Sequence, residues 1–525
     1  MSLTVNCQLS TENCLYPSTD NGKPSTENCL YPSTDNCEPP TVNCISNRQP
    51  KTVFISKLST AFMNRKLKTV TRELFNYCLS NNWAGYDPYD ALNSELFKKL
   101  PFLDWRLTRL AMTQILKRSP INFRPLLMIP KTQNPKALAL FLMALLKLEN
   151  SGMLNDTSLI PSMVQNIIAL RSDNNLLTEN RKPSTCNHRY QSTDNCEPVT
   201  VNRLSNRQLE TVNCEPVTVN RYYCWGYSFP WQGRSVLASR GEANLVCTVF
   251  VANAFLDLYE AQLCQLEKVN RKLETGYCQL SADNLLNIAS SSADYLMNEL
   301  FWTDGDEAGF SYPVPSIKTK VHNANFLGAA LLCRIYRHTD NKKYLEPALK
   351  AARYSARMQQ HDGSWNYGEL PTQRWIDNFH TGYNLVALQT ISKYLNTDEF
   401  LLNIKRGLQF YTNHFFRQNG APKYFHNKAY PFDIHSVAQS IITLLEMKDL
   451  DHNNIELACR IFDWTVANMW DKRGYFHYQI TPYYKNRISY MRWSQAWMLL
   501  ALTTLLETVN CKPSLSVNCL YNWKL

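Results

Sequence analysis

The sequence has little charge, no long apolar run and no block of basic residues. Charged residues make up only 19% of the 525, and the formal net charge is +11. Lys and Arg are scattered, which argues against a nucleic-acid-binding protein. The longest apolar run, residues 137–146, is too short to span a bilayer and predicts a buried helix. We therefore expect no nucleic-acid partner and no membrane insertion.

The seventeen cysteines are not spaced as in a disulfide scaffold or a zinc site. There is no CxxC pair, so a thiolate zinc site is not expected, and no cofactor is predicted. The beginning of the chain has no basic segment followed by an apolar one, the mark of a secretory signal. We expect a cytoplasmic protein. Nine cysteines follow an asparagine in a low-complexity repeat: Cys7, Cys14, Cys29, Cys37, Cys44, Cys196, Cys214, Cys511 and Cys519.

That repeat is built from units such as Thr-Val-Asn-Cys and Thr-Glu-Asn-Cys and resembles translated short tandem DNA repeats. Its polar composition, rich in Pro and Asn, cannot bury enough apolar surface to fold. A metal-binding or adhesive array is the alternative, but the cysteines have no histidine partners at ligand spacing. The predicted organisation is a disordered tail at 1–53, a first folded part at 54–182, a disordered insertion at 183–221, the remaining folded part at 222–507, and a repeat-derived tail at 508–525.

Outside the repeats, apolar residues recur at helical spacing. The predicted helices lie near 58–80, 104–117, 134–150, 159–172, 241–264, 283–301, 322–338, 343–360, 378–395, 398–417, 433–448, 453–470 and 489–507. No alternation of strands and helices supports a parallel sheet, which argues against doubly wound and (β/α)8 folds. Thirteen helices pair into about six hairpins. This count predicts an all-α (α/α)6 toroid, with inner helices around a central funnel and outer helices enclosing them.

A glycine-and-aromatic turn recurs between these hairpins. Four turns begin at Gly309, Gly363, Gly420 and Gly474, at spacings of 363 − 309 = 54, 420 − 363 = 57 and 474 − 420 = 54 residues. A period near 55 with two helices per period is typical of stacked helical hairpins. Degenerate turns at 83–87 and 225–229 are further expected members of the ring.

Polar residues follow the four turns at equivalent places. They are His322 and Asn325, Asp377 and His380, Asp433 and His435, and Arg492 and Gln495. If the hairpins close into a ring, these residues converge at one end of it. The sequence therefore predicts a functional site there.

Asp377 and His380 are the strongest candidates for chemistry. They stand three residues apart, share a helix face, and form a workable acid/base pair near neutral pH. The alternatives are that Asp377 caps the helix beginning at residue 378, and that His380 is a hydrogen-bonded core residue. Asp433 and His435 repeat the theme, and Asp433 is again a good helix cap. Three histidines from three hairpins, without a local His-x-x-x-His pair, do not predict a metal site.

Arg492 offers a planar fork for a carboxylate or phosphate, beside the aromatic Trp493. Several other aromatic residues follow the turns and could stack on sugar rings, although core packing is the alternative for each of them. They are Trp365, Tyr367, Trp375, Tyr383 and Tyr478. Asp87, Asp90 and Glu369 are the remaining carboxylates beside the turns.

Four segments resemble a bacterial family found in exopolysaccharide gene clusters, related to the polysaccharide biosynthesis protein VpsJ. They are 83–94 (WAGYDPYDALNS), 225–234 (WGYSFPWQGR), 362–383 (DGSWNYGELPTQRWIDNFHTGY) and 492–497 (RWSQAW). The resemblance extends over the non-repetitive chain from about 80 to 507 and implies an (α/α)6 toroid related to six-hairpin glycosidases. Some members carry the label δ-aminolevulinic acid dehydratase. That chemistry belongs to a (β/α)8 barrel, which the helical pattern here argues against.

The resemblance implies a carbohydrate-active protein acting on a polysaccharide or oligosaccharide, including an acidic one, alongside exopolysaccharide assembly machinery. Asp377 and His380 would then exchange protons at the sugar, and Arg492 would hold a uronate or phosphate. Asp87 and Glu369 are reserve acids, since an inverting hydrolase needs two carboxylates roughly 6.5–9.5 Å apart. An epimerase or lyase would instead use His and Tyr residues, Tyr383 among them, as proton shuttles.

Two alternatives come from other functional classes. Residues 359–365 resemble the QW repeat of squalene cyclases, but the chain has no DxDD acid motif. A non-catalytic glycan-binding or scaffolding toroid is the other alternative, because a fold does not determine a function.

Overall fold

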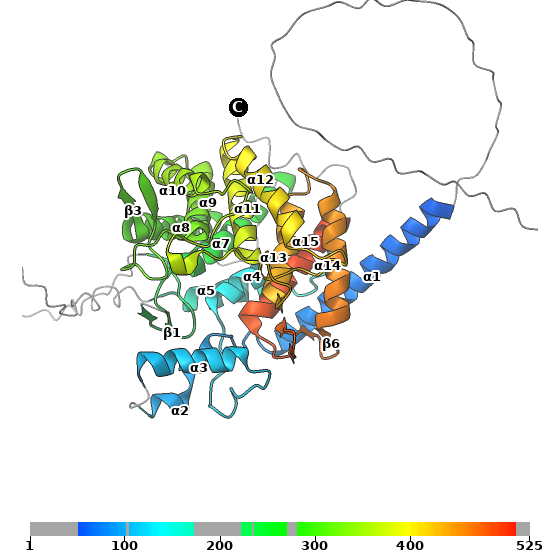
Figure 1. Cartoon of the computed structure of the whole chain (residues 1–525). Helices are drawn as coiled ribbons and strands as arrows, with labels where there is room; N and C mark the ends of the chain where they lie inside the picture. Colours follow the sequence, from blue (N-terminus) through cyan, green and yellow to red (C-terminus); the bar gives the residue numbers. More distant parts are fainter. Residues whose placement is uncertain (1–50, 101–103, 173–221, 234–235, 270–280, 511–525) are drawn as a thin grey trace, which may run out of the picture. The chain divides into compact units, whose positions relative to one another are not determined.

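The computed structural model describes residues 51–100, 104–172, 222–233, 236–269 and 281–510. The predicted insertion at 183–221 lies outside them, as do most of the predicted tails at 1–53 and 508–525. Residues 58–525 form one compact unit, to which the following description applies. Its described part is mostly helical (Figure 1).

Six helices form a closed inner ring. They are α4 (Pro135–Asn150), α7 (Leu245–Val269), α9 (His322–Thr339), α11 (Asn378–Leu395), α13 (Ile434–Glu446) and α15 (Trp497–Asn510). Each packs against the next along the chain, and α15 packs against α4, so the ring closes. This closure confirms the (α/α)6 toroid.

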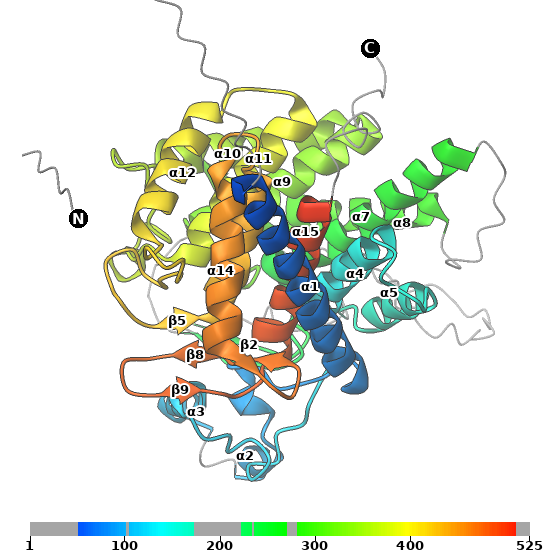
Figure 2. The ribbon, with the colours of Figure 1, turned by 90° about the vertical axis from the view of Figure 1, so that its right-hand side faces the viewer.

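Six further helices form an outer layer. They are α1 (Lys51–Ser80), α5 (Leu159–Ala169), α8 (Ala282–Tyr295), α10 (Leu345–Arg357), α12 (Leu401–His414) and α14 (Asn453–Met469). From α5 onward, each packs against the inner helix that precedes it. The last helix pair is completed from the N-terminal side: α1 lies beside α14 in Figure 2, and Lys66 forms an ion pair with Asp463 of α14 at 2.7 Å.

The predicted helix at 104–117 is present as α3 (Arg106–Arg118) but does not belong to the ring. It lies in an excursion between α1 and α4 that also holds the short helices η1 (Asp90–Asn93) and α2 (Glu95–Lys98). The other twelve predicted helices make up the inner ring and the outer layer, in agreement with the predicted count of about six hairpins. α1 also begins at Lys51, within the predicted tail and earlier than residue 58.

Two of the glycine-and-aromatic turns lie in short antiparallel strand pairs. The strands are β1 (Trp231–Gln232), β2 (Leu237–Ala238), β3 (Phe301–Asp304), β4 (Glu307–Phe310), β5 (Phe432–Asp433), β6 (Trp470–Asp471), β7 (Tyr475–Phe476), β8 (Gln479–Ile480) and β9 (Lys485–Asn486). They pair as β1–β2, β3–β4, β5–β8–β9 and β6–β7. Gly309 is in β4, and Gly474 stands between β6 and β7. Gly363 has φ +91°, and a Cβ there would lie 2.3 Å from the Arg406 carbonyl oxygen, so only glycine fits this turn.

Each of four turns is tied by its backbone to the start of the inner helix of the preceding hairpin. The N–H groups of His322, Asn378, Ile434 and Met491 donate to the carbonyls of Tyr367, Tyr424, Tyr478 and Tyr86, at 3.2, 2.9, 3.1 and 3.0 Å. The last of these bonds, with a parallel bridge between Tyr86 and Tyr490, joins the beginning of the ring to its end. These inner-helix starts therefore lie at the same end of the ring as the turns.

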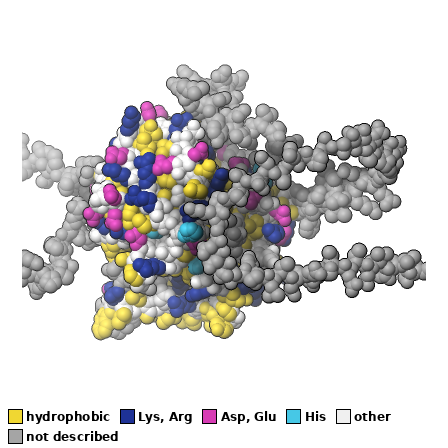
Figure 3. Space-filling view, turned by 45° about the horizontal axis from the view of Figure 1, so that its top comes forward, with side chains coloured by type: hydrophobic (Ala, Val, Ile, Leu, Met, Phe, Trp, Pro, Cys, Tyr) yellow, Lys and Arg dark blue, Asp and Glu magenta, His cyan; other side chains and the backbone are white. Residues whose placement is uncertain are grey.

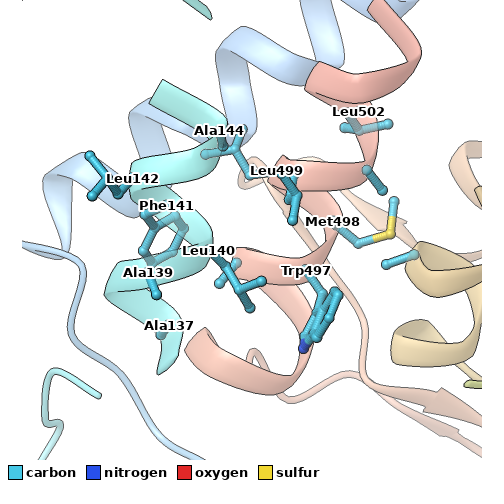
Figure 4. Close-up of a cluster of buried hydrophobic side chains, with 14 of the residues drawn as sticks. Ala137, Ala139, Leu140, Phe141, Leu142, Ala144, Trp497, Met498, Leu499 and Leu502 are labelled. Atoms are coloured by element: carbon cyan, nitrogen blue, oxygen red, sulfur yellow. The ribbon is translucent and has the colours of Figure 1, made fainter. Parts of the chain in front are cut away.

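Apolar side chains fill the space between neighbouring helices. Figure 4 shows one such contact, in which Ala137, Leu140 and Ala144 of α4 face the side chains of α15. Residues 137–142 are all at most 1% exposed, which confirms the prediction of a buried helix there. Within the described ranges, every helix falls short of the length or apolarity that a membrane-crossing segment needs.

Candidate functional site

Asp377 stands directly before α11 and accepts three hydrogen bonds. Its side chain caps the helix by accepting the His380 backbone N–H at 3.0 Å. It also accepts the Trp375 indole N–H at 2.8 Å and bonds the Nδ1 atom of His380 at 2.7 Å. The helix-capping role and the pairing with His380, which the sequence left as alternatives, therefore occur together.

His380 is held in one orientation by this carboxylate. Because a carboxylate can only accept, the shared proton belongs to Nδ1, and the lone pair of the imidazole is left on Nε2. The ring lies between Tyr367 and Phe379, with centroids 4.6 and 4.1 Å away. The side chain keeps 21% of its surface exposed. Nε2 of His380 is thus placed as a proton acceptor.

One turn further along α11, the Tyr383 hydroxyl bonds Nε2 of His435 at 2.6 Å. Burial, with the nearby cations Lys136 and Arg492, lowers the pKa of His435 well below its ordinary value. Burial also raises the pKa of Tyr383 well above 10. Both groups are therefore neutral near pH 7, and a single hydrogen bond joins them. Nδ1 of His435 has no hydrogen-bond partner among the described residues.

Asp433 repeats at α13 what Asp377 does at α11. Its carboxylate caps the helix by accepting the His435 backbone N–H at 2.9 Å. It also accepts the Trp493 indole N–H and the Gln479 amide, both at 3.0 Å. Burial raises its pKa to about 6, although these donors oppose the shift. The carboxylates of Asp377 and Asp433 are therefore both engaged by the protein itself.

Arg492 forms a buried ion pair with Asp87, at 2.7 Å through Nε and 2.9 Å through the terminal nitrogen Nη2. Its guanidinium carbon lies 4.9 Å from the centre of the Tyr227 ring. The fork that the sequence suggested for a substrate carboxylate or phosphate is thus filled by Asp87. The same ion pair removes Asp87 from the carboxylates available as a reserve acid.

Lys136 is a site residue that the sequence analysis missed. It lies in the first turn of α4, and its Nζ is 4.0 Å from the centre of the Phe250 ring and 5.2 Å from that of Trp497. Burial, and then the charge of Arg492, lower its pKa well below 10.5. No carboxylate in the described part of the chain pairs with it. The only signal in the sequence is a lysine at the start of an otherwise apolar buried helix.

Aromatic residues surround these polar groups. Trp375, 37% exposed, stacks on Tyr367 with centroids 4.5 Å apart and planes 12° apart. Trp493 is buried, with its ring 4.5 Å from that of His435. Partly exposed tyrosines lie around the same groups: Tyr89, Tyr227, Tyr312, Tyr367 and Tyr424. Trp375 is therefore the candidate with an open stacking surface.

His322, Asn325 and Trp365 do not join this group. They bond to Ser355 of α10 instead. The Ser355 hydroxyl lies 3.3 Å from Nδ1 of His322 and 2.9 Å from the Asn325 amide nitrogen. The Trp365 indole N–H donates to the Ser355 carbonyl at 3.0 Å. All three are buried, and burial lowers the pKa of His322 to about 4. They fasten α9 to α10 within one hairpin. Glu369 is also apart, accepting from the Tyr354 hydroxyl and lying 3.8 Å from the Lys320 ammonium.

The site therefore brings together His380, Tyr383, His435, Lys136 and Arg492, with Asp377, Asp433 and Asp87 as their partners. Its polar groups suit proton transfer by histidine and tyrosine. Each carboxylate that was predicted for the site and is described in the structure already bonds to another group of the protein. The described side chains also include no cluster of three or more His, Cys, Asp or Glu suited to hold a metal ion.

No protein-family model matches this chain, and no curated protein sequence matches it either. Solved structures with a similar fold include a cellobiose 2-epimerase from Spirochaeta thermophila, at 10% identity and a TM-score of 0.48, covering 88% of this chain and 98% of that one. A GH76 α-mannanase from Bacteroides thetaiotaomicron has 12% identity and a TM-score of 0.45, covering 71% and 85%. A sugar epimerase from a ruminal bacterium has 10% identity and a TM-score of 0.45, covering 73% and 91%. At these values the likeness carries no information about the reaction.

Proposed function

We propose that this chain is a carbohydrate-active enzyme that moves a proton on its sugar substrate, as an epimerase, isomerase or lyase does. The observation that carries the proposal is the bond from His380 Nδ1 to Asp377, which turns Nε2 into a fixed base. The neutral Tyr383–His435 pair nearby supplies a second proton-carrying group. A hydrolase is less well supported, because it needs two available carboxylates and the candidate ones are engaged.

The reactions in this class share a first step. His380 Nε2 removes the proton from the carbon next to a carbonyl or carboxylate of the sugar, and the C–H electron pair passes into an enolate. Return of a proton from the Tyr383 hydroxyl to the opposite face of that carbon gives the epimer. Loss of a leaving group from the neighbouring carbon gives elimination instead. His380 then releases its proton to solvent and the Tyr383 phenolate takes one up, so that both groups return to their starting states.

The exposed face of Trp375 supports a sugar as the substrate. An aromatic face of this kind packs against the apolar C–H face of a sugar ring, and Trp375 shares its carboxylate partner with His380. A sugar stacked there would lie beside the base. An exopolysaccharide, as the family resemblance implies, is the natural substrate under this proposal. A glycan-binding platform without chemistry is the second candidate, because Asp377 and Asp433 also serve as helix caps.

Deuterium exchange distinguishes these outcomes. Oligosaccharides and reducing sugars, acidic and neutral, would be incubated with the protein in D2O and followed by NMR. The wild type is expected to place deuterium at the carbon next to the carbonyl or carboxylate. His380→Ala should lose this activity by about 10²–10⁴-fold, whereas His361→Ala, which removes an exposed histidine, should not.

Asp377→Asn tests the mechanism more finely. The amide keeps an oxygen for the helix cap but no longer stabilises the imidazolium that forms during proton abstraction, so the exchange rate should fall. Cleavage without deuterium at that carbon would mean a hydrolase and would contradict the proposal. Glycan binding with neither exchange nor cleavage would leave the binding platform.

A further inference from the structure

The excursion between α1 and α4 presents an unusual number of large apolar side chains to solvent. Eight of the fifteen exposed large hydrophobic residues of the described chain fall within residues 96–128. They are Leu96, Trp105, Leu107, Ile115, Ile121, Phe123, Leu126 and Met128. Scattered exposed apolar residues need no explanation, but a concentration of this kind marks an interaction surface.

The exposed residues form one face of α3 and continue into the loop after it. Leu107, Ala111 and Ile115 stand at i, i+4 and i+8 and are all exposed, whereas Leu116, on the opposite side of the helix, packs against Ala91 and Ile129. The helix is therefore amphipathic with its apolar stripe facing outward. Figure 3 shows apolar side chains along the lower edge of the molecule, the end at which Figure 1 places α2 and α3.

A second segment joins this surface. The Tyr484 hydroxyl donates to the Arg118 carbonyl at 2.6 Å, and the Asn486 amide donates to the Ser119 carbonyl at 2.8 Å. These bonds hold the β8–β9 hairpin beside the end of α3. At the tip of that hairpin, Tyr483 is 91% exposed. The surface thus carries exposed Trp, Tyr and Phe in addition to aliphatic side chains.

The same segment carries an excess of basic residues. Residues 95–131 contain eight Lys and Arg against two acidic residues. Arg124 is buried and paired with Asp90, which leaves a balance of 7 − 2 = +5. Lys98, Lys99, Arg118 and Lys131 are exposed. A protein partner would need a matching acidic and apolar surface. An anionic bilayer supplies both features by itself, since its headgroups attract Lys and Arg while Trp, Tyr and apolar side chains enter the boundary below them.

We propose that the α2–α3 excursion, with the β8–β9 tip, docks this protein peripherally on a bilayer that contains anionic lipids. The docking is interfacial and needs no spanning helix. The excursion also reaches the candidate site, because Lys117 donates to the Tyr89 hydroxyl at 2.6 Å. Docking would therefore hold the site close to the membrane surface. The proposal goes beyond the proposed function and does not depend on it.

Vesicle flotation with the full chain tests the proposal. The protein is expected to float with vesicles of phosphatidylglycerol and phosphatidylcholine, and roughly tenfold less with phosphatidylcholine alone, since removal of the anionic headgroups removes the electrostatic attraction. High salt should reduce the binding to the anionic vesicles. The double variant Leu107→Asp/Ile115→Asp should lose it. Leu402→Asp, which changes a leucine on α12 that is 66% exposed against 75% for Leu107, should not.

Because these leucine and isoleucine side chains are exposed, the variants are expected to unfold at the same temperature as the wild type. Equal binding to both kinds of vesicle, no binding to either, or binding that survives the double variant would overturn the proposal. Self-association in solution that the double variant abolishes would show a protein interface instead, and would also overturn it. Deuterium exchange on a soluble sugar is unaffected by any of these outcomes and continues to report on the proposed function.

Discussion

The buried ion pair between Asp87 and Arg492 should be among the most costly polar contacts to break. Its two hydrogen bonds measure 2.7 and 2.9 Å, and the side chains are only 7% and 5% exposed. Removing one partner of such a pair leaves an uncompensated buried charge, which costs about 3–5 kcal/mol. Asp87→Ala is therefore expected to lower the free energy of unfolding by that amount. Arg492→Met should cost less, because Asp87 retains the Tyr89 backbone N–H at 3.0 Å.

The double variant Asp87→Leu/Arg492→Met distinguishes the charge from the packing. Apolar side chains of similar size remove both charges, so the double variant should be as stable as the wild type or more stable by about 1–4 kcal/mol. The contact also supports the bridge between Tyr86 and Tyr490 that closes the ring. Urea unfolding would be followed by circular dichroism and tryptophan fluorescence, because coincident transitions justify a two-state free energy.

An exposed ion pair of the same geometry provides the control. Arg353 and Glu399 bond through two contacts of 2.6 and 2.9 Å, but their side chains are 51% and 34% exposed. Glu399→Ala is expected to cost at most about 1 kcal/mol, because solvent screens the pair. If Asp87→Ala costs no more than Glu399→Ala, burial is not what makes the first pair strong, and the reasoning is refuted.

Two further predictions concern buried ionisable groups. Burial depresses the pKa of Lys136, so the unfolded chain binds more protons and the wild type gains stability as the pH rises toward the unfolded value of about 10.4. Lys136→Met should raise the melting temperature at pH 7, and the gain should shrink by pH 10; a destabilised variant at pH 7 would contradict this. Burial raises the pKa of Asp433 to about 6, so the folded chain holds this proton more tightly than the unfolded chain does. The resulting stabilisation is complete below pH 3.8, the unfolded pKa, and about 3 kcal/mol of it is lost as the pH rises through 6. Asp433→Asn should reduce the fall in urea midpoint between pH 4 and 7, and an unchanged slope would speak against the shift.

The helices and the ring could be predicted from the sequence because both depend on local and periodic signals. Each predicted helix is present to within several residues, since the apolar spacing that defines a helix is a property of consecutive residues. The caps Asp377 and Asp433 were also accessible, because a cap contacts backbone N–H groups two or three residues away. The count of thirteen helices then predicted about six hairpins, and closure of the ring followed from that number.

The repeat did not predict which side chains meet. It places the polar residues at the same end of the ring, but it does not determine the direction in which each side chain points from its helix axis. His322, His380 and His435 occupy the first, third and second positions of their helices. Successive positions on a helix point about 100° apart. His380 and His435 consequently reach the site, whereas His322 turns into its own hairpin and meets Ser355.

Secondary structure, the hairpin count and the end of the ring that carries polar residues were therefore determined by the sequence alone. The tertiary structure decided which polar side chains meet. It pairs Arg492 with an aspartate 405 residues away, joins Tyr383 to His435 across two hairpins, and leaves Lys136 without an acidic partner in the described chain. Contacts of this kind depend on ring closure and on the rotation of each helix about its own axis. Neither quantity is encoded in a short stretch of sequence, and both arise only when all the hairpins pack together.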